Sequence, residues 1–176
     1  IRLDGLERVT TPRLPPRTGE QVVVRTLVHE YYGVSEPLQE SEEGRVEGEE
    51  GRLVAGAEAL CDQPFEFVES LSKAWWITSG TPWVRALVVE RAGDAPEPTS
   101  ESLLKEIERH LREQADTVAT ALARQYGGAE QRWLDLIQAL SLSYGAEERK
   151  GLGALLAQAA RLRLAPRVDD AALPRY

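Results

Sequence analysis

Few residues of this chain belong to the types that usually carry chemistry. Histidine occurs only at His29 and His110, and cysteine only at Cys61. His29 precedes Glu30, and because histidine titrates near neutral pH it is the best candidate for a general base. In a strand, however, adjacent side chains point to opposite faces, so these two groups would not touch. We therefore assign no catalytic residue from the sequence.

The same census argues against metal and cofactor sites. Cys61 and the two histidines together are one ligand short of a closed zinc site built from cysteine and histidine alone. A single cysteine forms no internal disulfide, and without a nucleophile signature it is typical of a small buried hydrophobe. The dinucleotide fingerprint, the Walker A motif and the common hydrolase motifs are missing from the sequence. We expect no metal and no cofactor.

Tryptophan is concentrated in one stretch of the chain. Trp75, Trp76 and Trp83 lie within nine residues. Tryptophan offers a large apolar area and an N–H that needs a partner, so such a group can anchor a partner, line a ligand pocket or simply fill the core. Consecutive residues of a helix cannot both face inward, which places either Trp75 or Trp76 near the surface.

A strongly acidic stretch lies before the tryptophans. Residues 35–51 hold seven glutamates, one arginine and three glycines. Like charges this close repel one another, which predicts an exposed loop. The predicted surface for binding a protein partner combines this loop with the tryptophans, and its residues are Trp75, Trp76, Trp83, Glu47, Glu49 and Glu50.

Length and charge limit the class of protein. The chain has 176 residues, 42% of them hydrophobic, and a formal net charge of −8, which predicts one globular domain over 1–176. The acidic balance disfavours a nucleic-acid partner, since nucleic-acid affinity comes largely from Lys and Arg. The longest apolar runs have four or five residues, far below the roughly 18 needed for a membrane span. We therefore expect a cytoplasmic protein without membrane contact.

The first half of the chain permits two structural interpretations. Residues 20–33 are rich in β-branched and aromatic side chains, which predicts a strand. The same residues also fit a helix, with a capping box at Thr18 and Gln21 and a stop at Gly33. A similar ambiguity holds for 83–91, whereas 52–61 predicts a second strand.

Short segments separate these elements. A helix is expected from about Pro64, with Asp62 as its cap, to about Trp76. Proline, glycine and charge runs predict loops or linkers over 11–19, 35–51 and 92–100.

The second half is clearly helical. From 101 to 126 apolar residues recur at steps of three and four, which is one stripe of an α-helix. Further helices are predicted over about 129–144 and about 147–164, where Gly151 and Gly153 allow close backbone approach. The predicted fold is α+β, a small antiparallel sheet from the N-terminal half packed against a C-terminal layer of about three helices. A mainly α fold is the alternative.

Three functions follow from these patterns. The leading one is a non-enzymatic interaction module, such as an adaptor, chaperone-like subunit or regulator, for a protein partner or a second copy of the chain. The second is a small-molecule-binding domain or simple enzyme, with a cavity lined by Trp75, Trp83, Tyr31 and His29. The third is a helix-turn-helix DNA-binding regulator around Gly145.

Overall fold

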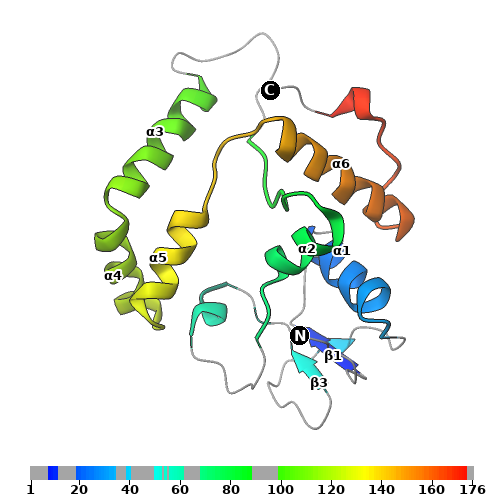
Figure 1. Ribbon diagram of the computed structural model, residues 1–176, viewed down its shortest axis with the longest axis horizontal. Helices are drawn as coiled ribbons and strands as arrows, with labels where there is room; N and C mark the ends of the chain where they lie inside the picture. The colour runs from blue at the N-terminus through cyan, green and yellow to red at the C-terminus, as the bar shows by residue number, and fades with distance from the viewer. Residues whose placement is uncertain are drawn as a thin grey trace. The chain divides into compact units, whose positions relative to one another are not determined.

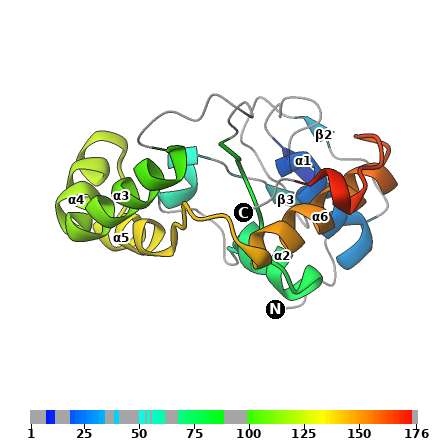
Figure 2. The same cartoon turned by 90° about the horizontal axis from the view of Figure 1, so that it is seen from above.

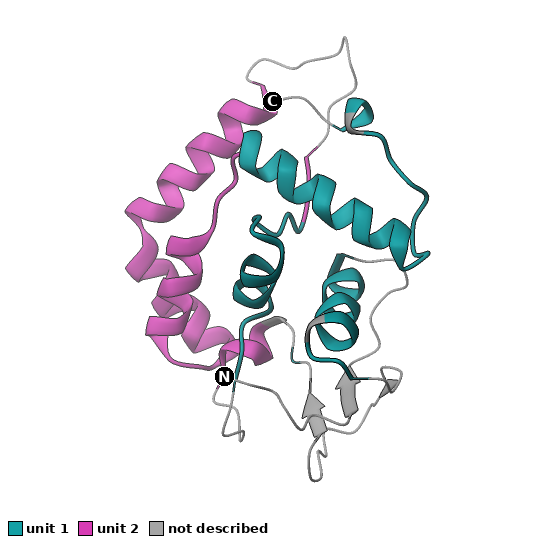
Figure 3. Ribbon diagram, turned by 45° about the vertical axis from the view of Figure 1, so that its right-hand side comes forward, with its two compact units in different colours: residues 1–54, 67–85, 144–176 teal, residues 55–66, 86–143 magenta. Residues whose placement is uncertain are grey.

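The computed structural model describes residues 8–11, 19–34, 39–40, 50–52, 54, 56–61, 68–88 and 99–173. The chain divides into two compact units, coloured separately in Figure 3: unit 1 comprises 1–54, 67–85 and 144–176, and unit 2 comprises 55–66 and 86–143. Such a division does not show whether either unit folds alone, so a single folding domain over 1–176 stays a prediction.

Unit 1 is built around three α-helices that share one hydrophobic core (Figure 1). They are α1 (Gly19–Arg25), which continues as the π-helix η1 (Thr26–Tyr31), α2 (Leu71–Ser79) and α6 (Ala146–Arg161). A short 3-10 helix, η3 (Asp170–Ala172), follows near the end of the chain. The core of unit 1 contains residues from all three α-helices, namely Val22, Val23, Leu27, Ala74, Trp75, Leu155 and Ala159.

The strand predicted over 20–33 is wrong, and the helical alternative is correct. Val22, Val23 and Val24 are all at most 4% exposed, because two separate apolar clusters cover different sides of this helix. This burial on two sides outweighs the β-propensity of valine. Gly33 follows the helix with φ +71°, as expected of a helix stop. Thr18 lies outside the described residues.

The predicted antiparallel sheet is also wrong. The strands β1 (Arg8–Thr11), β2 (Gln39–Glu40) and β3 (Glu50–Arg52) are short, and β1 pairs in parallel with each of the others. Of the strand expected over 52–61, only Arg52 is in β3, and residues 56–60 form a 3-10 helix. Residues 82–88 are neither helix nor strand. The described residues are mostly helical, so the mainly α alternative fits the structure.

The secondary-structure elements in the described residues of unit 2 are all helices, and its α-helices lie together in Figures 1 and 2. Its elements are η2 (Gly56–Leu60), α3 (Ser100–Glu113), α4 (Ala115–Tyr126) and α5 (Glu130–Ala139). Ala115 and Ala119 of α4 pack with Trp133 and Ile137 of α5 to form its core.

The single helix expected over 101–126 is interrupted. Gln114 has φ −112° and ψ 18°, which separates α3 from α4. No residue of α3 is buried, whereas α4 packs closely on α5. The apolar stripe is continuous in sequence, and the sequence therefore did not reveal this break. The helix expected over 129–144 ends earlier, at Ala139.

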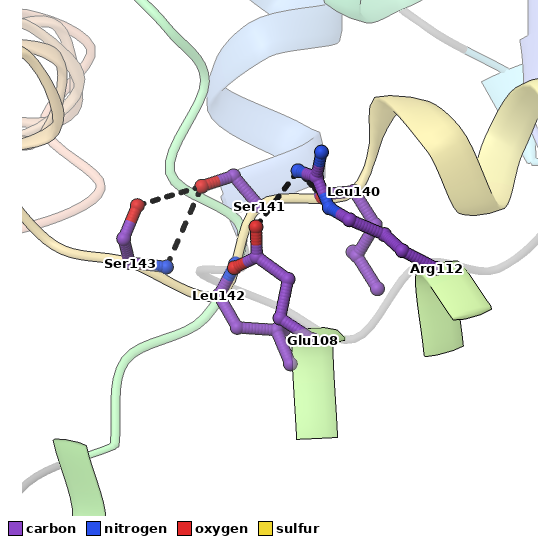
Figure 4. Close-up of polar contacts among 6 residues, drawn as sticks. All are labelled: Glu108, Arg112, Leu140, Ser141, Leu142 and Ser143. Atoms are coloured by element: carbon purple, nitrogen blue, oxygen red, sulfur yellow. Dashed lines mark hydrogen bonds and ion pairs between the residues drawn. The ribbon is translucent and has the colours of Figure 1, made fainter. Parts of the chain in front are cut away.

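The segment that follows α5 is held by two charged residues of α3 (Figure 4). A carboxylate oxygen of Glu108 accepts a hydrogen bond from the backbone N–H of Leu142 at 2.9 Å. Arg112 donates to the same carboxylate at 2.7 Å and to the carbonyl oxygen of Leu140 at 3.5 Å. This clamp fixes residues 140–143 within unit 2.

The helices of the described ranges were also searched for a membrane span. None of them combines the length and the apolar character that crossing a membrane requires.

Candidate functional site

The candidate site lies in unit 1, on residues 79–85, directly after α2. Gly80 has φ +67° and ends the helix, donating its backbone N–H to the carbonyl oxygen of Trp76. The Ser79 hydroxyl accepts a hydrogen bond from the backbone N–H of Thr81 at 3.2 Å and lies 3.0 Å from the Thr81 hydroxyl. These bonds form a tight turn that leads into Pro82 and Trp83.

Helix α6 supports this segment through a close backbone contact. A Cβ atom built on Gly151 would lie 2.1 Å from the carbonyl oxygen of Pro82. Only glycine permits this approach, because real Cβ contacts are never so short. The expected role of Gly151 in close packing is thus confirmed, and it places Pro82, and with it Trp83, directly against α6.

The Trp83 ring has a charged residue on its face and a glycine at its N–H edge. The Arg85 guanidinium lies over the ring, 5.3 Å from its centroid, and is 3.6 Å from a carboxylate oxygen of Glu20 on α1. A Cβ on Gly19, the first residue of α1, would lie 3.7 Å from Trp83 Nε1 and 3.6 Å from a methyl group of Leu155. Gly19 therefore leaves a methyl-sized space beside the indole N–H.

Two indole N–H groups of unit 1 are buried without a hydrogen-bond partner among the described residues. They belong to Trp75 and Trp83. By contrast, the indole of Trp133 in unit 2 donates to the carbonyl oxygen of Gly127 at 2.9 Å. A buried donor without an acceptor costs about 1–3 kcal/mol. Unpaired groups of this kind are uncommon and call for an explanation.

The three clustered tryptophans differ in how deeply they are buried. Trp75 is 1% exposed and Trp76 is 54% exposed, which confirms that only one of these neighbours faces inward. Trp83 is partly buried and packs against the same core cluster as Trp75. Of the acidic residues assigned to the partner-binding surface, Glu47 and Glu49 lie outside the described residues and Glu50 begins β3.

The sequence also suggested His29 and Tyr31 as ligand-binding residues, and both lie on η1. The His29 ring nitrogen Nδ1 is 2.7 Å from the carbonyl oxygen of Val34. The neighbouring Glu30 does not orient this ring, since its carboxylate interacts with Gln158 and Arg161 of α6. The side chain of Tyr31 is outside the described part of the structure.

The remaining residues with reactive side chains lie in unit 2. The Cys61 thiol is 3.6 Å from the carbonyl oxygen of Ala57 and 3.7 Å from that of Tyr126. His110 Nδ1 lies 3.8 Å from the Glu113 carboxylate, and both side chains are more than half exposed. Over the described ranges no group of His, Cys, Asp and Glu could hold a metal ion.

The sequence reasoning missed Gly19 and Arg85. The position of Arg85 could have been predicted from its spacing. In an extended chain, residues i and i+2 lie on the same side, and Arg85 is two residues after Trp83. Gly19 carried none, since the approach of α1 to Trp83 joins residues more than sixty positions apart.

Comparison with known proteins identifies the family. A family model described as menaquinone biosynthesis matches residues 16–161, well over half of the chain. No curated protein and no solved structure matches it. The match points to an enzyme-related biosynthetic role. The prediction of a non-enzymatic adaptor or regulator is therefore wrong, and the helix-turn-helix alternative is left without support. This chain belongs to the menaquinone biosynthesis family.

Proposed function

We propose that this chain acts in menaquinone biosynthesis as an enzyme that binds an intermediate of the pathway in unit 1, at residues 79–85. The observation that carries the proposal is the family match over residues 16–161. That range includes α1, the 79–85 segment and the whole of α6, which are the elements that surround Trp83.

The chemistry of the segment supports a role in binding a ring-shaped ligand. Trp83 offers an aromatic surface and an unpaired N–H, and Ser79 and Thr81 add hydroxyl groups that act as donors or acceptors. Arg85 holds the indole ring from one face. Aromatic surface with polar groups near it in the chain is typical of small-molecule sites.

The proposal is tested with a strain from which the gene is deleted. A block in the pathway makes the intermediate that this protein consumes accumulate, and mass spectrometry of the cell extract reveals it. Addition of the purified protein to that extract should remove the accumulated compound and form a new one. Denatured protein is the control. An extract in which no compound accumulates, or in which none is consumed, would contradict the proposed enzymatic role.

A cytoplasmic location, expected from the sequence, is part of the same proposal. Fractionation of cells that express the protein should place it with cytoplasmic markers. Recovery in the periplasm or the medium would contradict this part of the proposal and leave the biosynthetic role to be judged on its own test.

A further inference from the structure

We propose that residues 84–88 are an unpaired strand that binds an extended, uncharged, apolar polypeptide segment from outside these 176 residues by backbone pairing. The inference goes beyond the proposed function and does not depend on it. The segment follows Trp83 and is neither helix nor strand. It runs as an open trace without a helical turn (Figure 2).

The backbone groups of this segment have no partner within the described ranges. None of the hydrogen bonds in those ranges involves the N–H or the C=O of residues 84–88. By contrast, the backbone N–H groups of Gly80 and Thr81, just before the segment, both donate hydrogen bonds. A row of free donors and acceptors in an open chain is what an added strand pairs with.

The side chains of the segment are typical of a strand. Arg85 lies over the ring of Trp83, 5.3 Å from its centroid, so residues two apart share a side, as they do in a strand. Two of the residues 84–88 are valine, which favours strands. The segment contains none of the Gly, Pro, Asn, Asp and Ser residues that dominate turns. It therefore has the composition of a strand and lacks a neighbour.

The exposed side chains indicate an apolar partner. Leu87 is 38% exposed and Val88 is 63% exposed. Neighbouring side chains of an extended chain point to opposite sides, so apolar surface is open on both sides. Strands that are covered on both faces are continuous apolar runs, as Ala86 to Val88 is. An added strand with apolar side chains would cover part of this surface.

Charge distinguishes between the possible partners. Arg85 is the only charged residue of the segment, and its guanidinium lies 3.6 Å from a carboxylate oxygen of Glu20. A charged partner strand would therefore lose water without gaining a counter-charge. A second copy is disfavoured because each copy has a net charge of −8, and net charge of one sign keeps chains apart. The partner is thus an uncharged segment of different sequence.

Amide hydrogen exchange of the purified full chain, followed by NMR, tests the proposal. The probe is a soluble peptide of alternating threonine and valine with both ends capped. In the free chain the amides of Ala86, Leu87 and Val88 should exchange at nearly the rate of an unfolded peptide. The probe should slow exchange at alternate positions at least about tenfold, because a strand pairs every second N–H with one neighbour.

Matched peptides and variants separate backbone pairing from other contacts. The probe with all its backbone nitrogens methylated keeps the side chains and should give no protection. A peptide of alternating lysine and glutamate should bind more weakly than the probe. Val88→Glu places a charge at an exposed position, so it should keep the wild-type free energy of unfolding but raise the Kd for the probe at least about tenfold. Val88→Thr is the control and should leave the Kd within about threefold, because threonine keeps the β-branched shape.

Four results would overturn the inference. The first two are protection of residues 86–88 in the free monomer and absence of protection at any soluble concentration of the probe. The third is equal protection by the methylated peptide. The fourth is a dimer of the free chain in analytical ultracentrifugation that Val88→Glu dissociates, which would make a second copy the partner. None of these measurements uses menaquinone or its precursors, so their outcome is separate from that of the proposed function.

Discussion

At the scale of single residues, unit 1 and unit 2 use tryptophan in opposite ways. Trp133 fills the core of unit 2 and satisfies its N–H on Gly127. Trp75 fills the core of unit 1 and leaves its N–H unpaired among the described residues. Both side chains are at least 94% buried, so their contributions to stability differ chiefly in the state of this one donor.

Phenylalanine substitutions should expose this difference. Trp75→Phe creates a cavity but also removes a buried donor that costs about 1–3 kcal/mol, and the two effects partly cancel. Trp133→Phe creates a similar cavity and loses a hydrogen bond. We expect Trp133→Phe to lower the free energy of unfolding by at least about 1 kcal/mol more than Trp75→Phe, measured by urea unfolding. Equal losses would indicate that the Trp75 N–H has an acceptor.

The sequence predicted some of these residue roles and could not predict others. It anticipated that one of Trp75 and Trp76 faces inward, because the angular step between helix neighbours decides this. It could not show that Glu30 interacts with α6 and not with His29, since that pairing joins residues 128 positions apart. No local pattern encodes such a contact.

At the scale of elements, burial determined the secondary structure where the intrinsic propensity of the residues permitted both helix and strand. Residues 19–31 are helical because apolar clusters on two sides cover the valines. A sequence pattern does not say how many sides of an element are covered. The helix over 147–164 was predicted well, since its stop and its apolar face are both local signals; α6 ends at Arg161. The break at Gln114 was missed because the apolar stripe runs through it.

The contact between α6 and the 79–85 segment gives a prediction at this scale. Gly151→Ala places a methyl group 2.1 Å from the carbonyl oxygen of Pro82, so backbone must move. We expect a loss of about 1–3 kcal/mol in the free energy of unfolding, as for other overpacked positions. Gly19→Ala is the matched control and should be neutral or slightly stabilising, because its Cβ meets only ordinary contacts and alanine favours helices. A stable Gly151→Ala variant would show that α6 and Pro82 do not approach this closely.

The clamp on residues 140–143 gives a second prediction at the scale of elements. Glu108→Gln weakens a charge-assisted hydrogen bond to the Leu142 N–H, a class worth about 1.5–3 kcal/mol. Exchange of the Leu142 amide hydrogen should become about tenfold faster. Glu101→Gln is the control, since Glu101 pairs with Lys105 on the exposed face of α3. Unchanged exchange at Leu142 in Glu108→Gln would show that other contacts hold this segment.

At the scale of the whole molecule, the residue census led the functional interpretation in the wrong direction. A chain with two histidines and one cysteine suggested contact surfaces and not catalysis. The family match shows that this scarcity does not exclude a biosynthetic role. Aromatic rings, hydroxyls, backbone groups and arginine also bind and orient substrates, and a count of histidine and cysteine does not register them.

The role in menaquinone biosynthesis is tested by the menaquinone content of cells. Quinones extracted from a strain that lacks this gene, and from the same strain with the wild-type gene restored, are quantified by liquid chromatography and mass spectrometry. Menaquinone should disappear or fall sharply in the deletion strain and return on restoration. An unchanged menaquinone level in the deletion strain, when no second gene of the family is present, would contradict it.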